Sequence, residues 1–190
     1  MIYPLQIPII INPFKKHNEI KHTLLDMINN HRCSNYTFSG DESYLMHISK
    51  CDWPEGKIMK PRPWTNFFLP LLNVHLIQSM HEFNQHQFDI TQLWFQQYNT
   101  NSNHSWHTHG NNWTNVYYLD LPPDSPKTQF INPIDNSIQE FNVSEGDILS
   151  FPSFIPHQAP TNLSNSTKTI ISWNMDTTIN PRKLPQYLDK

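Results

Sequence analysis

The chain has 190 residues and a formal net charge of −3 when its 11 histidines are neutral. This length fits one domain with a substantial core. The weakly acidic balance, without a basic stripe, argues against a nucleic-acid partner. With four glycines the chain has no glycine-rich phosphate-binding motif, and no apolar run approaches the roughly 18 residues that cross a bilayer. Cys33 and Cys51 form no CxxC pair or disulfide framework, and no export signal precedes them, so we expect a cytoplasmic protein without a membrane partner.

The first 89 residues predict helices and irregular chain. Residues 3–11 read as a β-rich opening whose two prolines confine it to an edge strand. Apolar residues at helical spacing predict amphipathic helices over residues 15–30 and 65–85. The polar segment 33–63 between them, with several prolines and glycines, is expected to be long and irregular.

From residue 90 the pattern changes to short strands separated by turn-rich links. We expect strands at residues 91–99, 113–121, 129–132, 139–142, 147–151 and 167–173. Short strands at this spacing predict a sandwich or barrel, and a jelly roll is the natural candidate. The fold class is therefore mainly β with N-terminal helices. Because no repeat or boundary divides the chain, we expect a single domain over residues 1–190, with residues 1–89 packing on a β core at 90–176.

A group of histidines provides the strongest chemical signal. His107 and His109 are two residues apart, and on a strand their rings would point to the same face. His104 has the opposite parity on a regular strand, so we expect it beside the metal or on the substrate side. His157 follows a distant predicted strand, where a proline can turn it toward the first pair. Three imidazoles on one face of a metal ion leave positions open for substrate and oxygen, as a reactive iron centre requires.

A His-x-His pair alone, in a chain with 11 histidines, is more often surface chemistry than a metal site. The third histidine changes that interpretation, because the His107/His109 pair and the later segment that ends at His157 occur in the order expected of a metal site. Lys168, eleven residues after His157, begins another β-like run. A metal with a cation nearby suggests a metal-bound carboxylate co-substrate.

From about residue 91 to 176 the chain resembles a family of 2-oxoglutarate/Fe(II)-dependent oxygenases found in bacteria and marine phages. The second histidine segment also resembles the corresponding motif of cupins. The resemblance covers a little under half of the chain, and the N-terminal half matches only in its two helices. The matching segments are Trp106-His-Thr-His-Gly, Asn115-Val-Tyr-Tyr-Leu, Phe130-Ile-Asn-Pro, Gly146-Asp-Ile-Leu-Ser-Phe-Pro-Ser-Phe-Ile-Pro-His and Lys168-Thr-Ile-Ile-Ser-Trp-Asn.

The resemblance implies a double-stranded β-helix that holds Fe(II) near the barrel mouth through His107, His109 and His157. It implies that 2-oxoglutarate chelates the metal and that its far carboxylate meets Lys168. The implied activity is hydroxylation, in which decarboxylation of the co-substrate to succinate drives oxygen insertion into a C–H bond. The substrate would be a small molecule or an amino-acid side chain.

Two departures from the wider superfamily stand out. His109 occupies the position of a carboxylate in the usual HxD or HxE motif. Either three histidines bind the iron, which leaves the site one charge more positive, or His109 is not a ligand and another group takes its place. Lys168 replaces the usual arginine and loses its two-pronged geometry. Where relatives carry a hydroxyl two residues later, this chain has an isoleucine. Tyr117 or Tyr118, whichever faces inward, is expected to supply the missing hydrogen bond. Asn174 is expected either to contact the co-substrate or to end a strand.

Two other interpretations stay open. One is a three-histidine cupin-type metal dioxygenase or isomerase that does not use 2-oxoglutarate. The other is a non-catalytic jelly-roll module, such as a ligand-binding or virion-associated protein. The sequence gives no indication of the oligomeric state.

Overall fold

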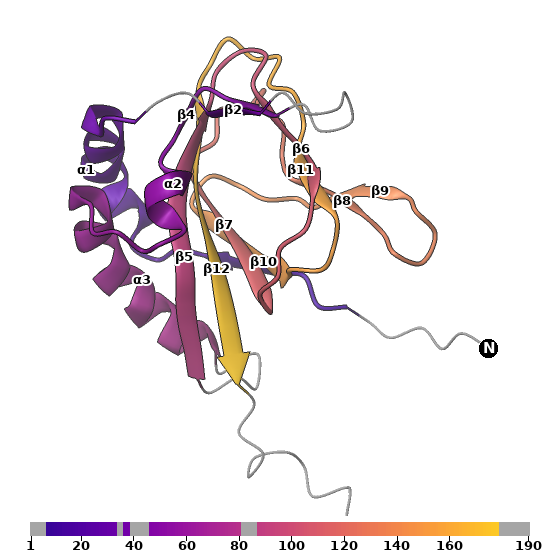
Figure 1. Cartoon of the computed structure of the whole chain (residues 1–190), viewed down its shortest axis with the longest axis horizontal. Helices are drawn as coiled ribbons and strands as arrows, with labels where there is room; N and C mark the ends of the chain where they lie inside the picture. The colour runs from indigo at the N-terminus through magenta and orange to yellow at the C-terminus, as the bar shows by residue number, and fades with distance from the viewer. Residues whose placement is uncertain (1–6, 34–35, 39–45, 81–86, 179–190) are drawn as a thin grey trace, which may run out of the picture.

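Two antiparallel six-stranded sheets face each other, with helices covering the outside of one of them (Figure 1). The computed structural model describes residues 7–33, 36–38, 46–80 and 87–178. The predicted class, mainly β with a jelly-roll arrangement, is confirmed. The major sheet has the strand order β1 (Ile10–Pro13), β10 (Asp147–Pro152), β7 (Trp113–Asp120), β12 (Lys168–Thr178), β5 (Gln87–Tyr98) and β4 (Lys50–Cys51). The minor sheet has the order β2 (Tyr36–Phe38), β3 (Met46–Ile48), β6 (Asn103–His107), β11 (His157–Ala159), β8 (Gln129–Ile131) and β9 (Ile138–Glu140).

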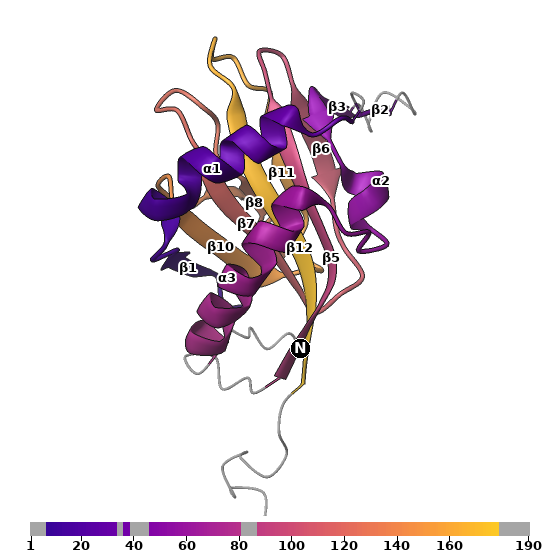
Figure 2. The same ribbon diagram turned by 90° about the vertical axis from the view of Figure 1, so that its left-hand side faces the viewer.

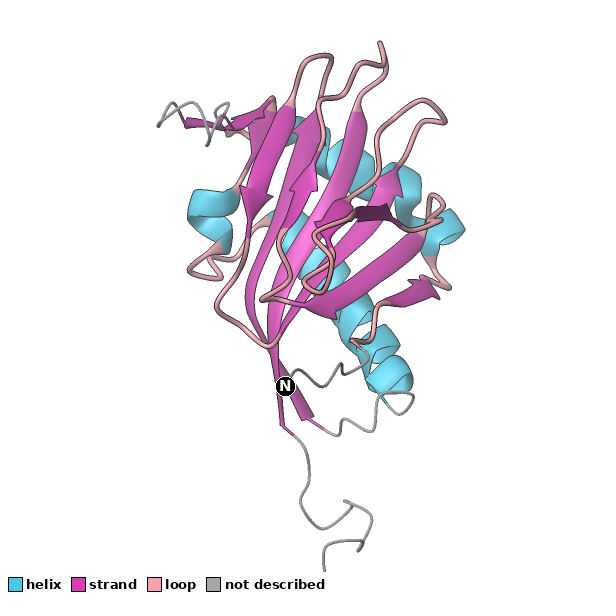
Figure 3. Ribbon diagram, turned by 90° about the vertical axis from the view of Figure 1, so that its right-hand side faces the viewer, coloured by secondary structure: helices cyan, strands magenta, loops and turns pink. Residues whose placement is uncertain are grey.

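The two long helices, α1 (His17–Asn30) and α3 (Pro63–Met80), lie across the outer face of the major sheet (Figure 2). Figure 3 views the opposite side, where strands face the viewer and the helices lie behind them. The predicted helix at 15–30 is confirmed, and the one at 65–85 is confirmed as far as Met80, beyond which residues 81–85 lie outside the described chain. None of the described helices combines the length and apolar content that a bilayer crossing requires.

Two hydrophobic clusters lie on either side of the major sheet. The first joins the helices to the sheet, because apolar residues four apart on α1 bury one stripe of that helix. The second fills the space between the sheets. Since strands β5, β7 and β12 carry both clusters, they are buried on both faces, and burial here stabilises the fold at roughly 25 cal/mol per Å² of apolar surface. The second cluster shapes the barrel interior, where the candidate site lies.

A β-bulge changes which residues of β5 face the barrel. In the pairing with β12, Asn174 is opposite Gln92 while its neighbour Met175 is opposite Ile90, so Thr91 is an extra residue in β5. Gln92 therefore lines the interior cavities, whereas Ile90 packs against the helix-side cluster. Side chains along β5 alternate between the helix side and the barrel interior. Without the bulge, Ile90 and Gln92 would point to the same side of the sheet.

The expectation of an irregular segment at residues 33–63 is wrong. Described parts of this segment form β2, β3 and β4 and the single-turn helix α2 (Trp53–Gly56). Each strand has only two or three residues. The strands β3 and β4 pair with the distant strands β6 and β5, and β2 pairs with β3. Such short pieces leave no local periodicity in the sequence. The expected edge strand at 3–11 overlaps the observed edge strand β1 only at Ile10 and Ile11. Residues 7–9 form no strand, and residues 3–6 lie outside the described chain.

Gly56 lets α2 approach β5 closely, and its replacement is expected to destabilise the fold. A Cβ atom at this position would lie 2.5 Å from the Leu93 carbonyl oxygen and 2.7 Å from the Trp94 Cβ atom. Because both neighbours belong to a buried central strand, we expect Gly56→Ala to lower the free energy of unfolding by about 2 kcal/mol. Gly110→Ala is the matched control, since a Cβ there meets nothing within 4 Å. Denaturant unfolding of both variants measures the difference, and equal stability would contradict the close approach.

Candidate metal centre

Three histidines from two adjacent strands and a loop meet in the barrel. His107 ends β6 and is directly opposite His157, which begins β11. His109 lies two residues beyond β6, and its backbone N–H donates to the Ser153 carbonyl at 3.0 Å. The ring centroids lie 4.2 Å apart for His107 and His157, 5.0 Å for His107 and His109, and 5.2 Å for His109 and His157. One ring nitrogen of each lies within 4.8 Å of the others. The structure thus brings together the three residues that the sequence singled out.

His104 joins this group because of a second bulge. Opposite the two-residue step from His157 to Ala159, strand β6 takes three residues, from His107 back to His104. One extra residue reverses the alternation, so His104 lies on the same side as His107 rather than on the opposite face. The two rings stack with centroids 3.8 Å apart and an interplanar angle of 15°. The Gln96 amide lies 3.3 Å from His104 Nδ1.

The imidazoles are in the form that binds metals. Burial lowers the pKa of His104, His107 and His157, and it lowers the pKa of His109 to about 3. All four rings are therefore neutral near pH 7. His107 Nδ1 donates to the Ser105 carbonyl at 2.7 Å, and His157 Nδ1 donates to the Ile155 carbonyl at 2.9 Å. These bonds fix the tautomer and leave each Nε2 with a free lone pair, the arrangement found in metal-binding histidines. The residues present fit a divalent transition metal.

Asn174 holds the third ring. It lies within β12 rather than ending it, and its amide nitrogen is 3.3 Å from His109 Nδ1 and 2.6 Å from the Gln92 amide oxygen. Its amide oxygen accepts from the Thr114 hydroxyl at 3.1 Å. Because the two ends of an amide are interchangeable in shape, the amides of Asn174 and Gln92 turned over together would let the Asn174 oxygen accept from the Gln92 amide and from His109 Nδ1–H, which releases His109 Nε2 for a metal. Asn174 thus takes the place in which metal-bound histidines commonly have a hydrogen-bond acceptor.

We expect Asn174→Ala to weaken metal binding about 10–100-fold, because the His109 ring loses the partner that orients it. Asn174→Asp is the matched comparison, since a carboxylate accepts from Nδ1–H without turning over and should retain the affinity. Competition with a chelating dye gives the dissociation constants for Zn(II). Wild-type affinity in the alanine variant would show that Asn174 does not position the ring.

Lys168 is buried at the start of β12, on the interior face. Only 2% of the residue is exposed, and its Nζ donates to the Pro126 carbonyl at 2.8 Å and lies 4.7 Å from the Tyr98 ring centroid. Burial lowers the pKa of this lysine to about 7, against the opposing field of Glu140. In the described chain no carboxylate forms an ion pair with Lys168. A buried ammonium with one carbonyl partner is suited to an anionic ligand.

The two candidate tyrosines face opposite sides of the major sheet. Tyr117 packs between Phe14 and Phe68 on the helix side, and its hydroxyl lies 2.8 Å from His17 Nδ1. Tyr118 belongs to the cluster between the sheets, with its hydroxyl 2.8 Å from the Thr128 hydroxyl. Of the two alternatives, only Tyr118 is on the interior side.

A small void of about 30 Å³ joins the histidines to the deeper part of the barrel. Sequence reasoning missed several polar residues that line it, among them Tyr98 and Thr128. Tyr98 is directly opposite Lys168 in the β5–β12 pairing. The signal was present as an alternation along β5, in which Gln92, Trp94, Gln96 and Tyr98 share a face.

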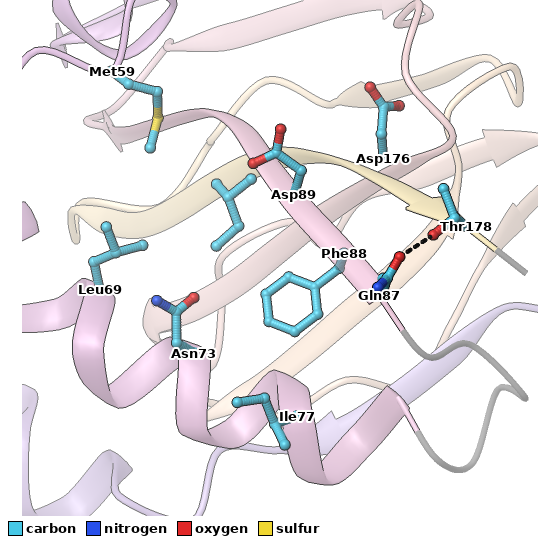
Figure 4. Close-up of a pocket in the computed structure, with 10 residues that line it drawn as sticks. Met59, Leu69, Asn73, Ile77, Gln87, Phe88, Asp89, Asp176 and Thr178 are labelled. Carbon is cyan, nitrogen blue, oxygen red and sulfur yellow. Dashed lines mark hydrogen bonds between the residues drawn. The ribbon is translucent and has the colours of Figure 1, made fainter. Parts of the chain in front are cut away.

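A second cluster of possible metal ligands and a large groove also occur in the described chain, but neither offers the set of free imidazole nitrogens found in the barrel. His31, Asp52 and Glu55 also lie close together, but both Asp52 oxygens already accept hydrogen bonds, from Arg62, Trp64 and the Phe95 backbone. A groove of about 820 Å³ lies between α3 and the ends of β5 and β12 (Figure 4). Its lining contains none of the four clustered histidines.

Solved structures share this architecture. A 2OG-Fe(II) oxygenase family oxidoreductase from Burkholderia pseudomallei superposes with a TM-score of 0.68 at 12% identity, covering 88% of this chain and 84% of that one. A Pseudomonas putida prolyl-4-hydroxylase gives 0.60 at 12% identity, covering 90% and 94%. A Trichoplax adhaerens prolyl hydroxylase, solved with a hypoxia inducible factor peptide fragment, gives 0.61 at 16% identity, covering 88% and 83%.

No profile of a known protein family matches the sequence. No curated protein matches it either. The likeness of this chain to known proteins is therefore a likeness of fold. This protein has the double-stranded β-helix fold of the 2OG-Fe(II) oxygenases.

Proposed function

We propose that the protein is a non-haem Fe(II), 2-oxoglutarate-dependent dioxygenase that hydroxylates a small molecule or an amino-acid side chain. The observation that carries this proposal is the pairing of two sites in one barrel: three neutral imidazoles, and a buried lysine that forms no ion pair with any carboxylate of the described residues. The fold shared with solved 2OG-Fe(II) oxygenases supports it.

The two sites lie within reach of one diacid, for which the void of about 30 Å³ between them has to widen. Lys168 and Ser172 lie on the same face of β12, and Ser172 lines the void beside the histidines. Four residues of strand separate their Cα atoms by roughly 13 Å. A lysine side chain and a five-carbon diacid together cover such a span. In this arrangement the keto acid end meets the metal, and the far carboxylate meets Lys168.

The residues of the chain bind, orient and exclude water. His107, His109 and His157 would hold Fe(II), which when bound supplies oxygen activation coupled to oxidative decarboxylation of the co-substrate. Lys168 would neutralise the far carboxylate, with the Tyr118 hydroxyl and Thr128 on the same interior side. The ring of Phe151 packs on His157 at 4.6 Å and keeps this side of the centre dry. Low water access strengthens the electrostatic contacts made there.

An anaerobic titration tests the proposal. Protein prepared without a histidine tag should bind one equivalent of Fe(II), and addition of 2-oxoglutarate should produce a visible metal-to-ligand charge-transfer band. On admission of oxygen, succinate should form. If there is neither a band nor succinate across a substrate screen, the proposal fails.

The same material separates the alternatives. A three-histidine cupin-type enzyme would bind iron, and its affinity for 2-oxoglutarate would be the same in Lys168→Glu as in the wild type. We expect Lys168→Glu instead to lose 2-oxoglutarate binding. A non-catalytic jelly-roll module would carry no stoichiometric metal.

A further inference from the structure

A second cavity opens beside the metal centre, on the side of the histidines away from Lys168. Its volume is about 230 Å³, and it lies between the segment from β3 to α2 and the barrel strands β5 and β6. At roughly 30 Å³ per water molecule, it holds about eight waters. His104, His107 and His109 form one wall, so a molecule in this cavity reaches the metal centre directly.

The described lining of this cavity carries no charge. Its apolar part consists of Met46, Ile48, Cys51, Trp53 and Trp94, and its polar part of Gln92, Gln96, Thr108 and the three histidines. No Asp, Glu, Lys or Arg is among these residues. Burial raises the pKa of the Cys51 thiol, which keeps it protonated.

The lining offers no partner for an ion. Three imidazoles bring no charge, so Fe(II), the 2-oxoglutarate dianion and the protonated Lys168 that pairs with its far carboxylate would together carry one net positive charge. A carboxylate in the place of His109 would make this sum zero. A cationic group would be repelled by the centre, and any charged group would lose its hydration in this cavity without a side chain of the described lining to pair with, which is costly for an ion.

We infer that the group that enters this cavity is uncharged and largely apolar, and that Met46 at its rim helps to set this selectivity. This inference rests on the proposed function, because it assigns the substrate class of that same centre. His104 and Gln96, whose amide nitrogen lies 3.3 Å from His104 Nδ1, supply polar groups in the cavity wall. An aliphatic or aromatic group that carries a hydroxyl or carbonyl fits these features.

Three molecules of one shape test the inference: cyclohexylmethanol, cyclohexylmethylammonium and cyclohexanecarboxylate. Each is titrated into protein loaded with Zn(II) and 2-oxoglutarate, with tryptophan fluorescence as the readout because Trp53 and Trp94 line the cavity. We expect the alcohol to bind at least tenfold more tightly than either ion. Met46→Glu should then raise the affinity for the ammonium ion at least tenfold, whereas the isosteric, uncharged Met46→Gln should not.

The outcome does not depend on turnover, so it separates this inference from the proposed function. Equal binding of alcohol and ions by the wild-type protein, or binding of none of the three, would overturn the inference even if succinate forms with another substrate. Selective binding of the alcohol would support it even if no succinate appears, in which case only the proposed function fails. Identical selectivity in Met46→Glu and Met46→Gln would show that Met46 does not contribute to the selectivity for uncharged ligands.

Discussion

Replacing His157 by alanine should abolish stoichiometric iron binding and, with it, succinate formation. His157 is 5% exposed, and its ring lies between those of His107 and Phe151. Removing it takes away one of three ligands and leaves a space at the centre of the site that water cannot fill with the same geometry. We expect at least a 1000-fold loss of Fe(II) affinity, on the order of the 4 kcal/mol that a lost ligand represents.

Metal analysis after gel filtration and a competitive titration measure this loss. His22→Ala, at an exposed position on α1, is the control for the total number of histidines. Retention of one tightly bound equivalent in His157→Ala would remove this residue from the site. His109→Asp adds a second comparison: it restores the carboxylate of the wider superfamily and should bind iron, whereas His109→Ala should not.

Replacing Lys168 by methionine should remove co-substrate binding while making the protein more stable. Methionine keeps the unbranched shape but has no charge to pair with the far carboxylate, so we expect at least a 100-fold weaker affinity for 2-oxoglutarate, equivalent to about 2.7 kcal/mol. The stability gain follows because the buried ammonium costs folding free energy. The charge-transfer band reports the affinity, and urea unfolding without co-substrate reports the stability.

The stability gain should depend on pH in a defined direction. The pKa of Lys168 is about 7 in the folded protein and 10.5 in an exposed lysine. Between these values the unfolded chain holds a proton that the folded protein has released, so the wild-type protein becomes more stable as the pH rises. Lys168→Met should exceed the wild type by on the order of a few kcal/mol at pH 6 and lose most of this advantage by pH 10. A constant difference across this range would mean that Lys168 does not titrate with folding.

The same pKa predicts how the affinity for 2-oxoglutarate changes. The dianion pairs with the protonated lysine, so binding above pH 7 takes up about one proton. The affinity should be flat below pH 7 and fall by about tenfold per pH unit above it. Calorimetry in buffers of different ionisation enthalpy measures the proton uptake directly. An affinity that stays constant from pH 7 to 9 would contradict Lys168 as the anchor.

Much of the site could be predicted from the sequence because its signals are local. His107 and His109 are close in the chain, and His157 follows a short strand bounded by a glycine turn and a proline, so their order and spacing are visible without coordinates. Helix α1 is predictable for the same reason, since its apolar stripe at helical spacing is a local pattern, whereas α3 is apolar on several sides and leaves Val74 and Ile77 exposed.

The rest depends on pairing between distant strands. The bulges at Thr91 and between His104 and His107 change which side chains face the barrel, and they arise only when β5 meets β12 and β6 meets β11. Tyr117 and Tyr118 could not be told apart in advance, because β7 is buried on both faces and its apolar residues do not alternate. The short strands β3 and β4, which form one wall of the second cavity, carry no periodic pattern.

A crystal structure of the protein with Mn(II) and 2-oxoglutarate tests the central claim most directly, with the metal located by its anomalous scattering. We expect one ion bound by the Nε2 atoms of His107, His109 and His157, each at about 2.0–2.2 Å, and the far carboxylate of 2-oxoglutarate against Lys168 Nζ. An ion bound elsewhere, or a His109 ring turned away from the metal with a carboxylate in its place, would contradict the three-histidine centre.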